Sequence, residues 1–407
     1  MKKVVVWGNG KTWERLKEYF DYNTYEIVAF VDSAPKANSV EIFDMSIPLY
    51  SSDVFFSLDL KVDIIAIFSI YEHEIRDSIS ASGKKYQNVT IYGLEEASKR
   101  LLNQCYYLER TLYNKIIEIE SSSCKSMHLN AKILEELNRK KEIHSINDVE
   151  FRVYSQWGED GIIAYLTSVI PIPNKMFVEF GVADYKESNT RYLLVDKNWK
   201  GLVLDSGKEN IEKIQNDDIY WRYGLTAKEA FITPENINEL IGSAGYSGDI
   251  GLLSVDIDGM DYWVLQAIDV VKPRIIVCEF NPVFGYKDAV TILPDNNFTR
   301  FSAHYSGTYF GASVRALQKL AKDKGYTYVG MCSNACNAFF VRDDLTSYLP
   351  QEVLNDDNMA ECNYRIGMDI DGKCTYMPCS EYIKVLENME VYDISSEKCK
   401  RVSEILI

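Results

Sequence analysis

Hydrophobic residues in the first hundred positions form short continuous runs that alternate with polar or amphipathic stretches. The runs predict strands at residues 4–7, 26–32, 62–69 and 88–93. Residues 11–20 carry Trp13, Leu16 and Phe20 at helical spacing, which predicts a helix. Continuous apolar strands separated by helices are typical of a parallel sheet that is covered on both faces.

The same alternation restarts at Phe151. Strands are predicted at residues 175–181, 200–206, 250–259, 273–281 and 337–342, and helices at residues 160–170, 262–268 and 313–326. Residues 382–394 predict one further helix and a short strand. The fold class that follows is α/β, with two Rossmann-like parallel-sheet domains joined by a helical connector.

The connector has a different composition from either domain. Residues 94–145 contain no Gly or Pro and are rich in Leu, Ile, Glu and Lys, so they predict one or two amphipathic helices, with a break at the SSSC of residues 121–124. These helices either pack on their neighbours as a linker or pair two copies of the chain in a homodimer through residues 100–148. The expected domains are 1–99, 100–148, 149–345 and a C-terminal extension, 346–407, packed on the third.

Composition narrows the classes of function. The 407 residues are 46% hydrophobic and 26% charged, as in an ordinary globular protein, and the net charge is −16. Acidic chains repel phosphate backbones, so we expect no nucleic acid partner. The longest apolar runs are shorter than a membrane helix, and MKKVVVWGNG leads directly into a strand, so we expect neither membrane insertion nor a signal peptide, and a cytoplasmic location.

Nine cysteines in a chain of this kind predict free thiols in a reducing compartment. Cys332 and Cys336 have a spacing that could begin a zinc site. Because no second pair with ligand spacing follows them, we predict no structural zinc.

A glycine turn follows the first predicted strand. The predicted nucleotide-binding residues of this turn and of the next strand end are Gly8, Gly10, Lys11, Thr12 and Asp32. Glycines allow close backbone approach, the following helix favours an anion, and an acid about twenty residues on suits a ribose. Trp13 replaces the third glycine of the dinucleotide pattern, so a domain that binds no dinucleotide remains an equal alternative.

A second glycine turn, FVEFGVADYKESNT, follows the strand at 175–181 and contains acids. A carboxylate here would repel a pyrophosphate but suits a ligand with a cationic amino-acid end and an adenosine end. Glu179 or Asp184 would meet the cationic end, Gly181 would allow close approach, and Asp205, at the end of the next strand, would accept the ribose hydroxyls.

Several segments together resemble one known family. They are SQWGEDGII, FVEFGVADYKESNTRYLL, WKGLVLD, LLSVDIDGMDYWVLQAI, PRIIVCEFNPVFG and YFGASVRAL. Residues 155–345 are similar in them to class I S-adenosylmethionine-dependent methyltransferases of the FkbM-like branch, which act on sugar, polysaccharide and natural-product hydroxyls. Residues 1–99 more weakly resemble Rossmann-like modules that precede polysaccharide-modifying enzymes.

The resemblance implies a seven-stranded Rossmann-like sheet with S-adenosylmethionine at the carboxyl ends of its strands. Glu179 and Gly181 would line the methionine end, Asp205 would hold the ribose, and Thr226, expected after the third strand, would lie near the adenine. The usual second glycine of the turn is Ala183 in this sequence, which would crowd the methionine slightly. Gln156 is a candidate for a lid over the cofactor, and Asp256 for a further cofactor contact.

Acidic residues follow two neighbouring predicted strands. Asp256, Glu279 and Asn281 would coordinate one Mg²⁺ or Mn²⁺ through oxygen, as in metal-dependent O-methyltransferases. Without a metal, crowding should raise the pKa of one carboxyl and let it act as general base, for which Asp258 is the candidate. His304, in an aromatic loop expected to cover the substrate, is the other candidate base.

The sequence therefore predicts an S-adenosylmethionine-dependent O-methyltransferase, with catalytic candidates Asp256, Asp258 and His304. The expected acceptor is a sugar, nucleotide-sugar or polysaccharide precursor. Two alternatives stay open: an NAD-dependent sugar-nucleotide oxidoreductase that uses the first glycine turn, and a non-catalytic binding module of a glycan-assembly complex.

Overall fold

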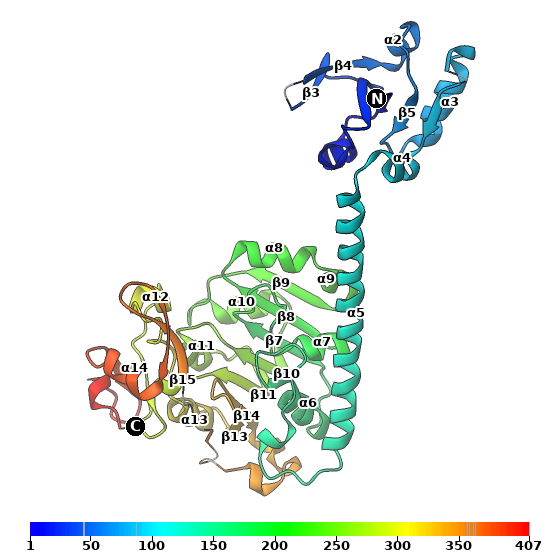
Figure 1. Cartoon of the computed structure of the whole chain (residues 1–407). Coiled ribbons are helices and arrows are strands. Elements are labelled where there is room, and N and C mark those ends of the chain that lie inside the picture. The colour runs from blue at the N-terminus through cyan, green and yellow to red at the C-terminus, as the bar shows by residue number, and fades with distance from the viewer. Residues whose placement is uncertain are drawn as a thin grey trace. The chain divides into compact units, whose positions relative to one another are not determined.

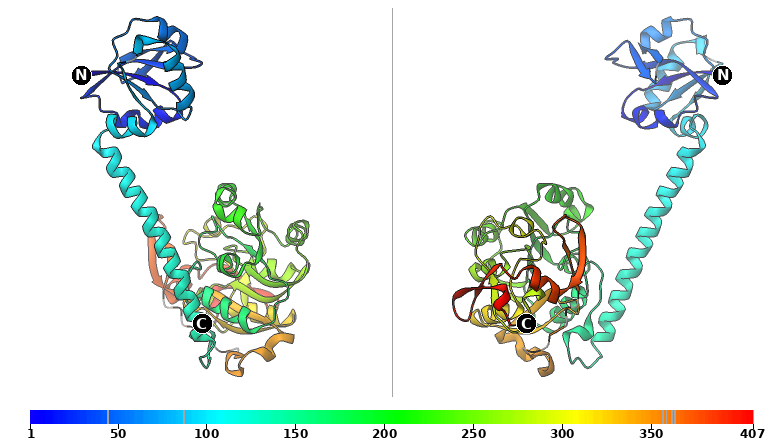
Figure 2. Two further views of the ribbon diagram at one scale, coloured as in Figure 1. Left: turned by 90° about the vertical axis from the view of Figure 1, so that its right-hand side faces the viewer. Right: turned by 60° about the vertical axis from the view of Figure 1, so that its left-hand side comes forward.

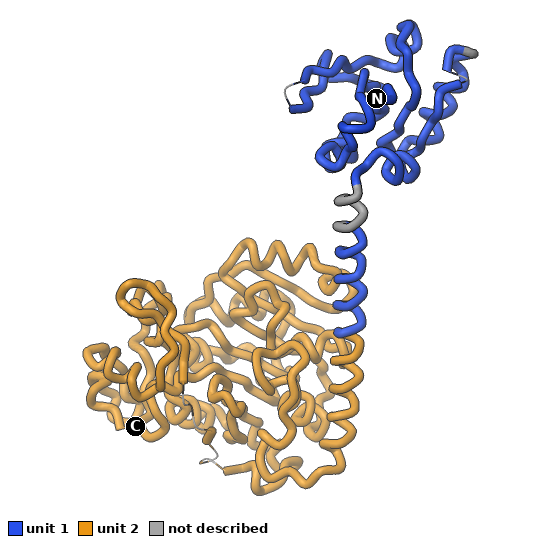
Figure 3. The backbone as a smooth tube through the Cα atoms, in the orientation of Figure 1, with its two compact units in different colours: residues 1–123 blue, residues 124–407 orange. Residues whose placement is uncertain are grey.

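The protein forms two compact units, Met1–Ser123 and Cys124–Ile407, which are coloured separately in Figure 3. The structure is a computed structural model. It describes the backbone of residues 1–43, 45–86, 88–355, 357, 359–360, 362 and 364–406, and their side chains apart from those of residues 84 and 104–109. Each unit is built around its own sheet.

Unit 1 carries a six-stranded sheet in its described residues. Its elements are β1 (Lys2–Trp7), α1 (Lys11–Leu16), β2 (Tyr25–Asp32), β3 (Ser39–Ile42), β4 (Met45–Ser51), α2 (Ser52–Ser57), β5 (Ile64–Ile67), α3 (Glu72–Ala81), β6 (Thr90–Tyr92) and α4 (Leu94–Leu101). The strand order is β3-β4-β2-β1-β5-β6, with β3 antiparallel to β4 and the other neighbours parallel. Strands β3, β4 and β5 are labelled in Figure 1. The strands predicted from the hydrophobic runs are confirmed, whereas β3 and β4 were not predicted.

Helices cover both faces of the sheet in unit 1. One face packs with α1 and α4 through a cluster that contains Trp13, Leu16 and Leu101. The other face packs with α2 and α3 through Phe55 and Ile79. Strand β1 buries Val4 to Trp7 completely or nearly so, because its side chains contribute to both clusters.

A single helix, α5 (Gln104–Asn138), follows α4. The expected break at residues 121–124 is wrong, since α5 runs through them without interruption. Serine costs a helix only a few tenths of a kcal/mol per residue, and the flanking segments are strong helix formers. Ala131 on α5 is buried in a cluster with Phe151, Ala164 and Tyr192 of unit 2.

Unit 2 carries a seven-stranded sheet in its described residues. Its main elements are α6 (Glu159–Val169), β7 (Met176–Phe180), α7 (Arg191–Lys197), β8 (Lys200–Asp205), α8 (Lys208–Asn216), α9 (Asp218–Arg222), β9 (Leu225–Glu229), α10 (Ile237–Ser243), β10 (Gly248–Val255), α11 (Asp261–Ala267), β11 (Val271–Glu279), α12 (Arg300–Ala303), α13 (Val314–Asp323), β13 (Tyr326–Met331) and β14 (Asn337–Arg342). The strand order is β13-β14-β11-β10-β7-β8-β9, and β14 runs antiparallel to both of its neighbours. The α/β fold class is thereby confirmed.

This sheet is also covered on both faces (Figure 2). Helices α10, α11 and α13 pack on one face, where Ile241, Leu265 and Leu317 join the core. Helices α6, α7 and α8 pack on the other, through residues such as Leu166 and Leu194. Because helices cover both faces of the sheet, polar side chains can gather only at the ends of its strands.

The C-terminal residues add smaller elements. They are β12 (Val290–Ile292), β15 (Tyr364–Met368), β16 (Cys374–Pro378), α14 (Cys379–Val385), β17 (Glu390–Asp393) and β18 (Lys398–Arg401). Strand β12 pairs with β17 and β17 with β18, whereas β15 and β16 form a separate hairpin. The helix and short strand predicted within residues 382–394 correspond to α14 and β17. None of the described helices is both long enough and apolar enough to cross a bilayer.

Candidate functional site

A cavity of about 240 Å³ opens at the carboxyl ends of the parallel strands in unit 2. Strand β7 lies between β8 and β10, so the chain order reverses beside it, and open α/β sheets bind ligands at such a point. The cavity is lined by residues of four strand ends and of the loop at 295–298. The lining residues are Gly181, Ala183, Asp205, Ser206, Ala230, Phe231, Ile232, Thr233, Pro234, Asp256, Ile257, Asp258, Met260, Asp295, Asn296 and Phe298.

The turn after β7 brings backbone close to backbone. Gly181 has φ +69°, and a Cβ at this position would lie 1.6 Å from the carbonyl oxygen of Asp256. No side chain fits there, so glycine is required. Ala183, two residues on, has φ +46°, a left-handed conformation that glycine adopts more easily.

Asp205 ends β8 and fixes this turn. Its Oδ2 accepts a hydrogen bond from the backbone N–H of Ala183 at 2.8 Å. Its Oδ1 accepts from the N–H of Gly207 at 2.8 Å and from the side chain of Asn210 at 3.0 Å. The carboxylate is therefore held at the cavity wall by the two loops that it joins.

The cavity is acidic. Asp205, Asp256, Asp258 and Asp295 line it, and among the described lining residues there is neither Lys nor Arg. Phe231, Ile232 and Phe298 contribute apolar surface, with Phe231 half exposed. Carboxylates with apolar walls favour a ligand that has a cationic end and a flat apolar end, and they disfavour a pyrophosphate.

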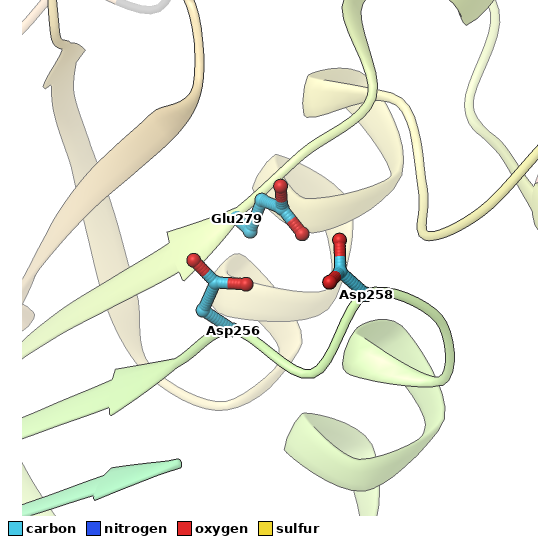
Figure 4. A group of neighbouring side chains, drawn as sticks. All are labelled: Asp256, Asp258 and Glu279. Carbon is cyan, nitrogen blue, oxygen red and sulfur yellow. The ribbon is translucent and has the colours of Figure 1, made fainter. Parts of the chain in front are cut away.

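Three carboxylates converge beside the cavity (Figure 4). Val255 pairs with Cys278 in the parallel register of β10 and β11, so the following residues, Asp256 and Glu279, lie side by side. Asp258 reaches them from the next loop with φ +54°, a conformation that Asp tolerates better than most residues. One oxygen from each of the three lies within 4.8 Å of the others.

The protonation of this group reflects crowding. Burial, and then the charges of Asp258 and Asp261, raise the pKa of Asp256 well above its usual range. Burial and the charge of Asp256 do the same for Glu279, whose Oε2 is buried without a hydrogen-bond partner. Such a pair holds a proton or a cation in place of two bare negative charges.

The loop that carries Asp258 is tied down from two sides. Asp261, at the start of α11, accepts hydrogen bonds from the N–H groups of Ile257 at 2.8 Å and Gly259 at 3.0 Å, and burial raises its pKa to about 6. Arg300 forms an ion pair with Asp258 and donates to the carbonyl of Gly307. The exposed carboxylate of Asp258 is thus already paired with a cation.

The expected metal ligand Asn281 has other partners. Its amide Nδ2 donates to the carbonyls of Thr308 at 2.9 Å and Phe310 at 3.0 Å, and its Oδ1 accepts from the N–H of Val283 at 3.0 Å. Both ends of the amide thereby hold loops together, and a metal-ligand role of Asn281 stays a prediction. Among the described carboxylates, Asp258 lies in one group with Asp256 and Glu279.

Glu179 is not among the described residues that line the cavity. It is buried, and its carboxylate accepts hydrogen bonds from the N–H groups of Asn189 at 2.8 Å and Thr190 at 3.2 Å, and from the Thr190 hydroxyl. Burial raises its pKa to about 7 despite these bonds. Its contacts hold the loop before α7.

Four other candidates lie outside the described cavity lining. Asp184 accepts from the N–H of Lys186 at 3.2 Å, and exposed Gln156 accepts from the indole of Trp157 at 3.1 Å. Thr226 was expected after a strand; this is wrong, because it is the second residue of β9, and residues 230–234 take its expected place. His304 bonds to Ser306 Oγ at 2.8 Å, and burial lowers its pKa.

The first glycine turn lies in unit 1 at the carboxyl end of β1. Gly8 follows Trp7, which pairs with Val31, so the turn lies beside Asp32. Gly8 has φ +99°, Gly10 precedes α1, Lys11 is exposed and Thr12 is half-buried. Asp32 accepts a hydrogen bond from Ala34 N at 3.0 Å.

Trp13 fills the space behind that turn. It is completely buried and contacts Phe20, Phe30 and Phe68 with ring centroids 5.3–5.7 Å apart. A glycine at this position would leave the room that a dinucleotide pattern needs, whereas the indole occupies it.

Several cavity residues were not predicted from the sequence. They are Ser206, the loop Ala230–Pro234 after β9, and the loop at 295–298. Ser206 follows β8 and Ala230–Pro234 follow β9, so a correct placement of β9 would have found the second group. The segment LTAKE has too few apolar residues to mark a strand by its pattern, and the loop at 295–298 has no periodic signal at all.

Comparisons with known proteins match the two parts of the chain differently. The family model described as "C2185-like, N-terminal" matches residues 1–89. No curated protein matches the chain.

Solved structures resemble about half of the chain. One is the N-terminal domain of EvdMO1 in the presence of SAH and D-fucose, at 12% identity and TM-score 0.32, covering 54% of this chain and 95% of that one. Another is an S-adenosylmethionine-dependent methyltransferase from Clostridium acetobutylicum, at 12% identity and TM-score 0.29, covering 53% and 98%. A third is an O-methyltransferase from Bacillus cereus in complex with SAH, at 10% identity and TM-score 0.29, covering 51% and 88%. At such scores, the function of this chain has to be argued from its own residues.

Proposed function

We propose that the protein is an S-adenosylmethionine-dependent O-methyltransferase that acts on a hydroxyl of a sugar, nucleotide-sugar or polysaccharide precursor. The observation that carries the proposal is the cavity at the switch point of unit 2, with four carboxylates and no described cation in its lining. The sheet has the seven strands that the family resemblance implies. The cytoplasm remains the expected location.

The residues that line the cavity suit this cofactor in charge and polarity. Gly181 and Ala183 present backbone at its floor, and Asp205 lies at the end of the second strand, where a ribose would be held. Phe231 and Phe298 offer apolar surface for an adenine, and Asp256 and Asp258 place negative charge near the cationic end. When bound, S-adenosylmethionine supplies an electrophilic methyl group on a sulfonium.

The carboxylate group fits a divalent cation. Asp256, Asp258 and Glu279 offer three oxygen ligands within 4.8 Å of one another, and the unpartnered Oε2 of Glu279 is a buried acceptor that a cation would satisfy. A bound Mg²⁺ or Mn²⁺ would supply Lewis-acid polarisation of an acceptor hydroxyl. Asp258 would have to share its charge between this cation and Arg300.

The residues themselves must position the acceptor and take its proton. Methyl transfer is an in-line displacement, so orientation supplies much of the rate. Asp256 lines the cavity, and burial raises the pKa of its carboxyl, so that its carboxylate is a stronger base than an ordinary aspartate. His304 remains the second candidate base, since its lowered pKa keeps the imidazole neutral and able to accept a proton.

The test is transfer of a labelled methyl group from S-adenosylmethionine to a panel of monosaccharides and nucleotide-sugars, with Mg²⁺ or with a chelator. We expect transfer to at least one acceptor and a loss of about 100-fold or more in Asp256→Asn. The control is Asp218→Asn, at a surface ion pair with Arg222. Methyl transfer that persists unchanged in the presence of the chelator would contradict a role for a divalent cation in the reaction.

Two further assays, NAD reduction and the binding of SAH and NADH, separate the alternatives. Reduction of NAD by a nucleotide-sugar would favour the oxidoreductase that uses Gly8, Gly10, Lys11, Thr12 and Asp32. A folded protein that binds neither SAH nor NADH would favour the glycan-assembly binding module. The domain boundaries 1–99, 100–148, 149–345 and 346–407 stay predictions, as does the homodimer.

A further inference from the structure

Helix α5 exposes apolar side chains at heptad spacing in two segments, residues 112–119 and 133–137. Leu112, Ile116, Ile119, Ile133 and Leu137 are 49–67% exposed. They fall on alternating steps of three and four residues when the polar positions 123, 126 and 130 are included. This seam of eight positions spans 26 residues, or about 39 Å of helix, close to four heptads.

The seam residues that belong to unit 2, such as Ile133 and Leu137, are not on the face of α5 that packs on the rest of that unit. The face of α5 that packs there contains buried Ala131, His128, whose Nδ1 lies 2.7 Å from Asp196, and Glu135, which bonds to Tyr192 and Lys197 at 2.5 Å. Residues 133 and 137 lie on other sides of the helix from Ala131, since a turn takes 3.6 residues. Ile133 and Leu137 therefore lie on a different face of α5 from the one that packs on the rest of unit 2.

We infer that this seam pairs with the same seam of a second copy, as a parallel, in-register two-stranded coiled coil. The inference is independent of the proposed function. Five of the eight seam positions carry Ile or Leu, and the three central positions carry Ser123, Ser126 and Asn130. Ile and Leu at heptad spacing are typical of such pairing. A single Asn at a seam position, here Asn130, fixes register and a two-stranded state because the two amides can bond to each other.

The flanking charges fit a second copy in this register. In a parallel pair, Lys115 of one chain faces Glu120 of the other, and symmetry repeats the attraction. Leu129 faces Leu134 in the same way, and both are exposed in the single chain, at 60% and 39%. The flanking positions from 115 to 134 bring no like charges together.

The antiparallel arrangement fits less well. It would set Ile119 against Asn130 at two places, and each amide would then face an aliphatic side chain in place of another amide. An unpaired polar group costs free energy when it is buried in a seam. The composition of the seam therefore favours the parallel orientation over the antiparallel one. A different protein would have to carry polar residues at the same seam positions in order to pair equally well.

The first test is the molar mass of the purified full chain in solution, by sedimentation equilibrium at micromolar concentration. We expect twice the 46.7 kDa of one chain. Ile116→Asp, on the seam, should weaken the dimer at least tenfold. Ile117→Asp is the matched control, because Ile117 is 46% exposed on the next position but lies off the seam, and this variant should remain dimeric.

Three results would overturn the inference: a wild-type monomer, dissociation by Ile117→Asp as readily as by Ile116→Asp, or an unchanged dimer in Ile116→Asp. Ile119→Asp serves as a second seam variant, with helix content checked by circular dichroism. A photo-crosslinking amino acid at residue 112 tests the register. Crosslinks to the segment around residue 112 of the second copy support a parallel pair, whereas crosslinks around residue 137 contradict it.

Discussion

The two units share one supersecondary pattern, but the space beside its glycine turn is filled in unit 1 and open in unit 2. Each contains a strand, a turn with a positive-φ glycine and a helix in succession, and in each the next strand ends with an aspartate. In unit 1 the space behind the turn is filled by Trp13. Among the described residues of this unit, Ser98 is the one polar residue that is buried. Unit 2 instead buries a set of polar and acidic side chains around its turn, among them Glu159, Asp160, Glu179 and Asp205.

The two aspartates show what the pattern alone leaves undecided. Asp32 bonds to Ala34 within its own loop, whereas Asp205 reaches across to Ala183 in the glycine turn. Only the second carboxylate is thereby held against the backbone that forms the cavity. A strand, a glycine and an acid predict a place for a ligand, and the surrounding side chains decide whether the place is filled or open.

The largest expected effect comes from the two glycines at the turns. Gly181→Ala puts a Cβ 1.6 Å from a carbonyl oxygen, so we expect a loss of more than about 4 kcal/mol in the stability of unit 2. Gly8→Ala meets its nearest oxygen, that of Phe68, at 3.1 Å and adds strain from φ +99°, so we expect about 1–3 kcal/mol in unit 1. Thermal and denaturant unfolding of both variants measures the difference. Equal losses would contradict the tighter turn in unit 2.

The next effect concerns the acids of unit 2. Because the pKa of Glu279 is raised above its ordinary 4.5, its contribution to stability is full below that pH and is lost as the pH rises through its folded value. Without divalent cations, Glu279→Gln should therefore be more stable than the wild type at pH 8, by at least about 1 kcal/mol. The readout is the unfolding midpoint between pH 5 and pH 9.

Mg²⁺ sharpens the same comparison. It should raise the unfolding midpoint of the wild type more at pH 8 than at pH 5, because protons compete for the same oxygens. Glu279→Gln should lose most of that gain. A gain that is independent of pH, or that survives the substitution, would show that the cation binds elsewhere.

The smallest expected change in stability concerns the residue two positions after the first glycine of each turn. Ala183 adopts φ +46° and Gly10 has φ −80°. Ala183→Gly relieves a left-handed alanine and should stabilise unit 2 by up to about 1 kcal/mol. Gly10→Ala meets nothing within 4 Å and should change unit 1 by less than about 1 kcal/mol. A clear destabilisation by Ala183→Gly in denaturant unfolding would mean that this methyl group packs usefully.

Much of the fold could be predicted because buried parallel strands are apolar on both faces. The runs around Val4, Ile65, Leu202 and Ile276 marked their strands unambiguously. Strands β3, β4 and β9 were missed because they lie toward sheet edges and carry polar residues. The SSSC segment was misread because the preference of serine for turns is weaker than the helical tendency of its neighbours.

The candidate site was predictable only as far as strand ends determine it. Register alone brings Asp256 beside Glu279, and the chain order brings Gly181 beside Asp205. What the side chains do once there depends on long-range partners. The carboxylate of Glu179 accepts hydrogen bonds from Asn189 and Thr190, and the local sequence pattern does not predict such contacts.

The most direct test of the account is calorimetric titration of SAH into the full-length protein and into two matched variants, Asp205→Ala and Asp32→Ala. The account predicts binding to the wild type, a loss of at least about tenfold in affinity in Asp205→Ala, and unchanged affinity in Asp32→Ala. Circular dichroism would confirm that both variants are folded. Absence of binding to the wild type, or a loss in Asp32→Ala with none in Asp205→Ala, would contradict a cofactor site in unit 2.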